Sequence, residues 1–76
     1  MIMPHEDLAN AIILQAVRDW RKAVGKLKKW PRYRPATELQ EECEEFFLSD
    51  WFTILTKVDG NDLLWKLKKE EGIDDE

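Results

Sequence analysis

Residues 44–64, which read EEFFLSDWFTILTKVDGNDLL, place four aromatic side chains beside two signals that start a helix. Ser49 and Asp50 are residue types whose side chains accept hydrogen bonds from the first backbone N–H groups of a helix, so a helix is expected after them. The turn-forming residues 59–62 predict a second start, with Gly60 free to adopt positive φ and the Asp or Asn side chains able to cap the helix. The stretch therefore predicts short helices that pack through aromatic rings.

The residues before this stretch predict one long helix, a loop and a second helix. Pro31 and Pro35 each disfavour helical geometry in the preceding residue, so a loop is expected between them. Thr37 and Gln40 have the spacing of a capping box, which would start the next helix. Apolar side chains of the long helix recur at steps of three and four, the period that keeps them on one face: Ile13, Val17, Trp20, Val24, Leu27 and Trp30.

These signals predict an all-α fold, a small bundle of one long N-terminal helix and about three shorter helices. The expected helices span 4–30, 37–48, 50–57 and 61–71, with an acidic tail at 72–76, in a single domain over 1–76. No interior stretch alternates with the period of a strand. A chain of 76 residues has little core to spare. Seven side chains are expected at its centre: Trp20, Phe46, Phe47, Trp51, Phe52, Leu55 and Leu64.

The first half of the long helix carries apolar side chains outside the main stripe. Ile12, Leu14 and Ala16 lie on other faces of the helix, so one face cannot bury them all. Either a second helix or a second subunit is expected to cover them. A homodimer is therefore an open alternative.

Charge is distributed in two blocks of opposite sign. The chain has a net charge of −4, which gives no overall attraction to nucleic acid or to an anionic membrane. Residues 18–34 carry eight basic side chains and one acidic one, a net +7, whereas residues 38–50 carry six acids and no base, a net −6. Such blocks on consecutive helices are expected to pair with each other or to face solvent.

Residue content argues against enzymatic chemistry. His5 is the only histidine and Cys43 the only cysteine, so neither a disulfide nor a zinc site can form within the chain. Cys43 is expected to be core filler, with nearby glutamates raising its thiol pKa. The carboxylates lack the histidines of a di-metal site. We expect no catalytic residue, no metal and no cofactor.

The sequence also predicts a location. No apolar run approaches the roughly 20 residues needed to cross a membrane. Residues 1–10 lack the basic start of a secretion signal, and a lone cysteine suits a reducing compartment. We expect a cytoplasmic protein with no membrane contact, in the cytosol of a bacterial host.

Two kinds of partner fit these patterns. A protein partner would use acidic and aromatic side chains as steering charges and anchors: Glu38, Glu41, Glu42, Glu45, Trp30 and Tyr33. The alternative is DNA or RNA bound by the basic face of the first helix, through Arg18, Arg21, Lys22, Lys28, Lys29 and Arg32. In either case the rings of Trp30, Tyr33 and Trp65 could instead fold back over the bundle.

Four segments together resemble a family of small phage- and prophage-encoded proteins from Gram-positive and gut bacteria whose functions are unassigned. They are AIILQAVRDW at 11–20, ECEEFF at 42–47, SDWF at 49–52 and VDG at 58–60. The resemblance covers most of 8–67. It implies a phage or mobile-element origin and supplies no catalytic residue.

The expected function is a non-enzymatic protein–protein interaction module of phage type. By analogy with other small phage proteins, it could inhibit a host or anti-phage defence protein, as anti-CRISPR proteins do, with acidic side chains imitating a nucleic-acid backbone. The alternative is a small DNA- or RNA-binding regulator.

Overall fold

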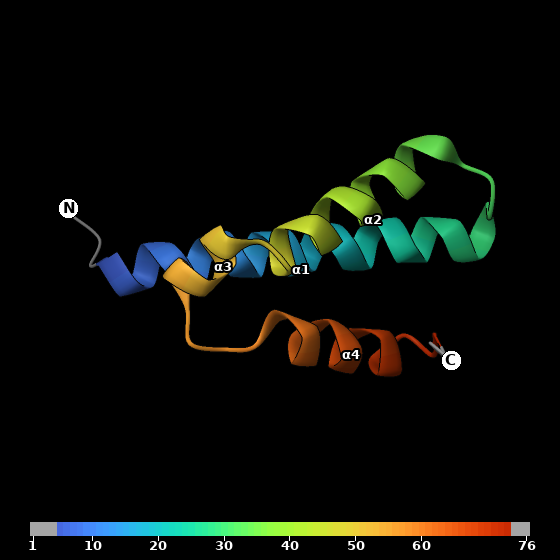
Figure 1. Cartoon of the computed structure of the whole chain (residues 1–76). Coiled ribbons are helices and arrows are strands. Elements are labelled where there is room, and N and C mark those ends of the chain that lie inside the picture. The colour runs from blue at the N-terminus through green and yellow to red at the C-terminus, as the bar shows by residue number, and fades with distance from the viewer. Residues whose placement is uncertain (1–4, 74–76) are drawn as a thin grey trace.

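Four helices account for most of the residues described in the computed structural model, which covers 5–73, with side chains from Leu8 onward. They are α1 (His5–Lys29), α2 (Arg34–Phe47), α3 (Asp50–Leu55) and α4 (Gly60–Glu70). No strand occurs within 5–73. The predicted all-α bundle, with one long helix and three shorter ones, is confirmed (Figure 1).

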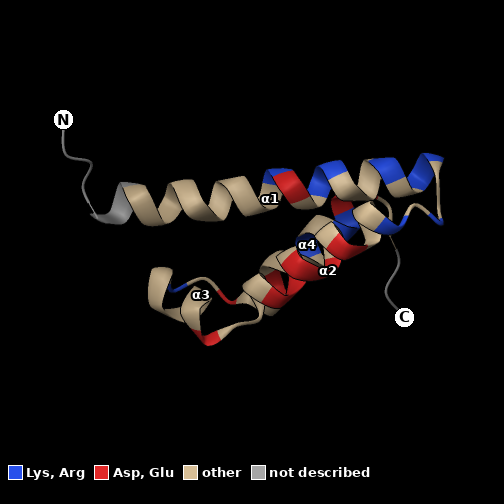
Figure 2. Ribbon diagram, turned by 90° about the horizontal axis from the view of Figure 1, so that it is seen from above, with Lys and Arg blue, Asp and Glu red and all other residues tan. Residues whose placement is uncertain are grey.

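The long helix α1 is the spine of the molecule. Figure 1 shows α2 folding back along α1 and α3 beside the first half of α1, and in Figure 2 α2 and α4 lie on the same side of α1. The α1–α2 pair is the most extensive contact between elements. Helix α4 packs against α2, and one buried core cluster takes residues from all four helices.

Three aromatic side chains are completely enclosed at the centre: Trp20, Phe47 and Phe52. Leu64 is also buried, as predicted, and Phe46 is partly buried against this cluster. The ring of Phe52 meets those of Phe46 and Phe47 edge to face, with centroids 5.6 and 5.9 Å apart. Each such pair contributes about 0.5–1.5 kcal/mol beyond its buried area, so this cluster fixes α3 against α2.

The prediction that Trp51 lies at the centre is wrong, because its side chain is 55% exposed. Successive residues of a helix point about 100° apart. With Phe52 turned inward, Trp51 is turned toward the surface, where its ring rests edge-on against Phe46 at 5.9 Å. Leu55, also predicted at the centre, is only partly buried.

The second helix starts three residues earlier than predicted. Tyr33 is its N-cap, with no side-chain hydrogen bond, and Pro35 occupies the first turn, where its missing N–H has no intrahelical partner to lose. Thr37 does not cap the helix. Its hydroxyl donates instead to the carbonyl oxygen of Tyr33, at 3.4 Å, from within the first turn.

The third helix begins as predicted. The hydroxyl of Ser49 accepts a hydrogen bond of 3.3 Å from the backbone N–H of Phe52. The helix ends at Leu55 rather than at 57, because Thr56 adopts an extended conformation with φ −155° and ψ 158°.

Gly60 is required for a different reason from the one predicted. It has no positive φ. It is instead a buried first residue of α4, and a Cβ there would lie 2.8 Å from the carbonyl carbon of Phe47 and closer still to its oxygen. The N-cap is Asp59, whose carboxylate accepts a hydrogen bond of 2.9 Å from the N–H of Asn61. The glycine thus allows α4 to approach the end of α2.

The C-terminal end of α4 is closed by Gly72, with φ 76°, the left-handed conformation that suits glycine after a helix. The predicted tail at 72–76 does not begin there, because Ile73 is partly buried against the core. Residues 74–76 lie outside the described residues, as does Pro4, the predicted start of the first helix.

Candidate functional site

The surface of the molecule differs from one end of α1 to the other. The helix has no charged side chain from Leu8 to Val17 and becomes densely charged from Arg18 onward, as Figure 2 shows. The first half of α1 and the neighbouring α3 therefore form an apolar end, and the second half forms a basic corner with the α1–α2 loop. An acidic face lies on α2.

At the apolar end, an open groove with a volume of about 280 Å³ lies between α1, α2 and the start of α3. Its apolar lining consists of Ile12, Ala16, Leu39, Phe46 and Trp51, with Cys43 also in the lining. Its polar lining consists of Gln15, Asp19 and Glu42. The volume is just below the roughly 300–1,000 Å³ of small-molecule pockets, so this groove suits one or two anchoring side chains better than a whole cofactor.

Large apolar side chains remain exposed around this end of the molecule. They come from α1 or from residues 48–58, and each has about half or more of its surface in contact with solvent: Leu8, Leu14, Leu48, Trp51, Ile54 and Val58. Single exposed apolar residues are common, but a concentration of them marks an interaction surface. A second helix or a second subunit was expected to cover this part of α1. Within the chain Ile12 and Ala16 are only partly buried, and Leu14 is exposed.

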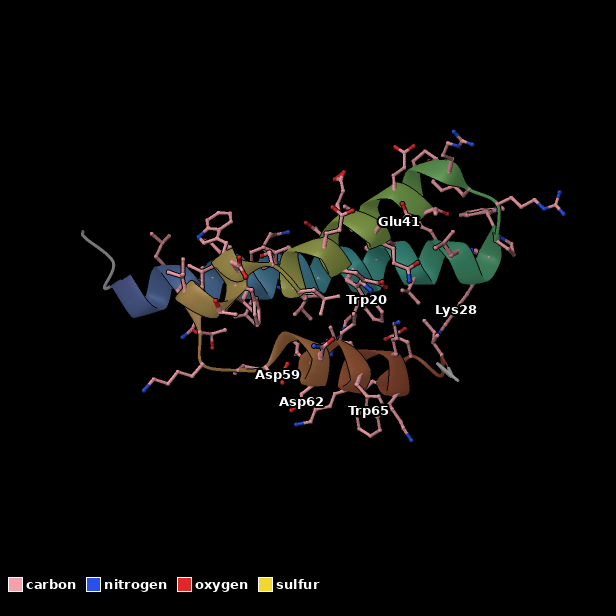
Figure 3. The ribbon with its side chains drawn as sticks, in the orientation of Figure 1. Trp20, Lys28, Glu41, Asp59, Asp62 and Trp65 are labelled. Atoms are coloured by element: carbon pink, nitrogen blue, oxygen red, sulfur yellow. The ribbon has the colours of Figure 1, made fainter. Side chains whose placement is uncertain are left out.

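The four acidic residues predicted to bind a partner are all exposed on α2. Figure 3 shows Glu41 pointing outward from the bundle. Glu38 and Glu45 share that face because they lie three and four residues from it along the helix, whereas Glu42 lines the apolar groove. The structure thus separates Glu42 from the other three.

Glu44, predicted to face largely outward, is instead partly buried. Its Oε2 accepts hydrogen bonds from Nε1 of Trp20, at 3.0 Å, and from Nε2 of Gln40, at 2.9 Å. This carboxylate therefore has a structural role between α1 and α2, and it is not part of the outer acidic face.

The basic residues predicted to bind nucleic acid are all exposed: Arg18, Arg21, Lys22, Lys28, Lys29 and Arg32. Two of them form ion pairs with the end of α4, Arg21 with Glu70 at 2.8 Å and Lys28 with Glu71 at 3.3 Å. Figure 3 shows the Lys28 side chain directed toward that end of α4. These two members of the basic block thus pair with the C-terminal end of α4 and not with the acidic residues of α2.

Trp30 and Tyr33 form an exposed aromatic pair at the basic corner, with ring centroids 6.3 Å apart. The Nζ atoms of Lys26 and Lys29 lie over the two rings, 5.9 Å from Tyr33 and 5.4 Å from Trp30. Two shallow hollows of about 480 and 420 Å³ adjoin the pair. The rings do not fold back over the bundle, and Trp30 does not belong to the core stripe in which the sequence placed it.

Trp65 is the fourth tryptophan and is 56% exposed on α4. Figure 3 shows its side chain directed away from α1. Nζ of Lys69 lies 4.9 Å from its ring centroid. Its position far from the groove makes it a matched counterpart for Trp51.

Cys43 is buried, as predicted. Burial raises the pKa of its thiol from 9.0 to about 11, with further contributions from the negative charges of Asp19, Glu42 and Glu44. The thiol is therefore protonated and a poor nucleophile at neutral pH. Within 5–73 no cluster of three or more His, Cys, Asp or Glu side chains is arranged to hold a metal ion, and no helix there is both long and apolar enough to cross a bilayer.

Sequence reasoning missed Asp19 and Trp51 as groove residues. The signal for the groove was present in Ile12 and Ala16, which lie beside the main apolar stripe of α1, but the partner elements were not identifiable. Comparison of the chain with protein-family models, curated proteins and solved structures found no match.

Proposed function

We propose that the protein is a non-enzymatic interaction module that binds another protein through the α1–α2–α3 groove. The observation that carries this proposal is Trp51, a large ring with 55% of its surface exposed at the edge of an apolar groove. Tryptophan is enriched among the residues that dominate binding energy in protein interfaces. Binding a partner that covers this ring would be favourable, because it would remove a large apolar surface from water.

The arrangement of charges supports a protein partner over a small molecule. The groove is shallow and open, whereas small-molecule sites enclose most of their ligand. Its apolar lining is adjoined by the acidic α2, which gives a centre of apolar contacts beside charged side chains. An apolar core with a polar rim is the usual anatomy of a protein interface.

The resemblance to phage-encoded proteins suggests the setting, a bacterial cytosol in which the partner is a host or anti-phage defence protein. In this proposal Glu38, Glu41 and Glu45 on the outer face of α2 contact basic side chains of that partner. Inhibition would follow if those side chains normally hold nucleic-acid phosphates, since carboxylates would then occupy the phosphate sites.

Photo-crosslinking tests the proposal directly. The photoreactive residue p-benzoylphenylalanine is placed at Trp51 or, as the matched control, at Trp65, whose exposure is almost the same. Each variant is expressed in a Gram-positive bacterium carrying phage-defence systems, irradiated and treated with nuclease. A protein adduct is expected at 51 and not at 65. No adduct at 51, or equal adducts at both positions, would overturn the proposal.

The Trp30–Tyr33 pair favours a second candidate function, binding of single-stranded nucleic acid. Exposed rings among cations stack on bases while the cations contact phosphates, and such binding weakens steeply with salt. A fluorescently labelled single strand titrated at about 50 and 200 mM salt tests this candidate, with Trp30→Ala as the disrupting variant and Trp65→Ala as its control. An absence of binding at the lower salt concentration would exclude it.

A further inference from the structure

The charged side chains that line the α1–α2–α3 groove all have the same sign. Asp19 enters the lining from α1 and Glu42 from α2, whereas no Lys or Arg lines it. The carboxylate of Asp19 is held by Gln15, whose Nε2 donates a hydrogen bond of 3.0 Å to Oδ1. The groove therefore combines apolar walls with carboxylates contributed from both helices.

The negative charges of the groove also affect the thiol of Cys43, which lies in the same lining. Asp19 and Glu42 both raise the pKa of its thiol, in addition to the larger effect of burial. A negative potential thus extends into the groove, and it would favour positive charge on whatever occupies it.

We propose that the occupant is a basic amphipathic helix of a partner protein, with apolar side chains in the groove beside Trp51 and Lys or Arg side chains facing Asp19 and Glu42. This inference rests on the proposed function and names the class of partner. An amphipathic helix that lays its apolar face into a groove is a recurring mode of recognition, in which flanking charges set specificity. Here it would pack across α1 and α2 as the third helix of a local bundle.

The same charges disfavour a second copy of the chain as the occupant. A symmetric dimer formed through this groove would bring two identical acidic patches together, so the carboxylates of Asp19 and Glu42 from both copies would share one interface. Like charges placed opposite each other weaken association. The first half of α1 also offers no basic side chain that could compensate them.

The first experiment uses three synthetic peptides of about 18 residues, roughly five helical turns. One has leucines at helical spacing on one face and lysines elsewhere, the second replaces lysine by glutamate, and the third scrambles the first so that no apolar face forms. Calorimetric titration of the full chain is expected to give one-to-one binding of the lysine peptide, about tenfold or more tighter than either other peptide. No binding of the lysine peptide, or equal binding of the glutamate peptide, would overturn the inference.

Paired variants then locate the contact. Glu42→Lys and Asp62→Lys change the net charge equally, but Glu42 lines the groove, whereas Asp62 is exposed on α4. Trp51→Ala and Trp65→Ala remove equally exposed rings from different helices. The Glu42 and Trp51 variants are expected to weaken binding by about tenfold or more, and the Asp62 and Trp65 variants by less than about twofold. Equal effects within either pair would mean that binding follows bulk charge or general hydrophobicity, which contradicts the inference. Circular dichroism checks that each variant keeps its helical content.

Crosslinking at Trp51 distinguishes failure of this inference from failure of the proposed function. If protein adducts form at 51 but the lysine peptide neither binds nor competes with them, the module still binds proteins and the basic-helix inference is wrong. If no adducts form at 51, the proposed function itself fails. A dimer in analytical ultracentrifugation that Trp51→Ala dissociates would make a second copy the occupant, and would also overturn the inference.

Discussion

The indole Nε1 of Trp20 donates a hydrogen bond of 3.0 Å to Oε2 of Glu44, which joins the enclosed centre of α1 to the side of α2. Trp20 has no exposed surface, so its N–H group has no access to water and needs a protein acceptor. The same oxygen accepts the amide of Gln40. One glutamate in an acidic block is thus a structural connection between the two largest helices.

We therefore expect Glu44→Ala to destabilise the fold by about 1–3 kcal/mol, the usual cost of leaving a buried donor unsatisfied. Glu44→Gln, which retains an acceptor oxygen, should lose less. Glu45→Ala is the matched control because it removes an exposed glutamate from the same helix, and its effect should stay within about 0.5 kcal/mol. Urea unfolding followed by circular dichroism measures all three. Equal losses in the two alanine variants would contradict the structural role of Glu44.

The two internal glycines should respond in opposite ways to alanine. A Cβ at Gly60 would clash with the backbone carbonyl of Phe47, whereas one at Gly25 meets nothing within 4 Å. Backbone cannot move aside as a flexible side chain does, so Gly60→Ala should cost about 1–3 kcal/mol or more. Gly25→Ala should stabilise α1 by about 0.5–1 kcal/mol, since glycine weakens helix interiors. Thermal unfolding of both variants checks the signs of the two stability changes. An unchanged stability in Gly60→Ala would mean that α4 is not held tightly against α2.

Local sequence signals predicted helices well but did not determine which of two competing starts is used. Thr37 and Gln40 predicted a capping box, whereas Pro35, which was interpreted only as a loop residue, lies in the first turn of the helix. The proline start was adopted, with Tyr33 as an N-cap that makes no side-chain hydrogen bond. Starting three residues earlier lets Ala36 become buried, a tertiary gain that spacing along the chain does not reveal.

Side-chain direction was harder to predict than helix position. Trp51 and Phe52 are neighbours of similar character, and only the packing of α3 decides which of them turns inward. The two charge blocks were expected to pair with each other or to face solvent, and the acidic side chains Glu38, Glu41 and Glu45 face solvent. Helices α1 and α2 meet through buried residues of one core cluster such as Val24 and Cys43, and the outer acidic face of α2 is exposed. The partners of Arg21 and Lys28 come from α4, whose path depends on the whole fold.

The thiol of Cys43 makes stability depend on alkaline pH. Its pKa is about 11 in the folded chain against 9.0 for an ordinary thiol, so between these values the unfolded chain binds fewer protons. Stability from this group is therefore fully present below about pH 9 and is lost as the pH rises toward 11. The measured quantity is the difference between wild type and Cys43→Ala in the slope of unfolding free energy against pH, because this difference isolates the thiol from every other group. Identical slopes of unfolding free energy against pH in the two proteins would contradict the raised pKa of the Cys43 thiol.

The ion pair of Arg21 with Glu70 should add little stability, because both side chains are about half exposed, 48% and 60%. Exposed pairs contribute about 0–1 kcal/mol and are screened by salt. A double-mutant cycle with Arg21→Ala and Glu70→Ala should give a coupling energy within this range at low salt and close to zero at about 1 M, where the screening length is about 3 Å. A cycle with Lys22→Ala in place of Arg21→Ala provides the control, since Lys22 lies next to Arg21 but does not pair with Glu70. A coupling above about 2 kcal/mol that persists at high salt would mean that Glu70 is held in a buried network, and α4 would then be anchored by charge as well as by Leu64 and Leu67.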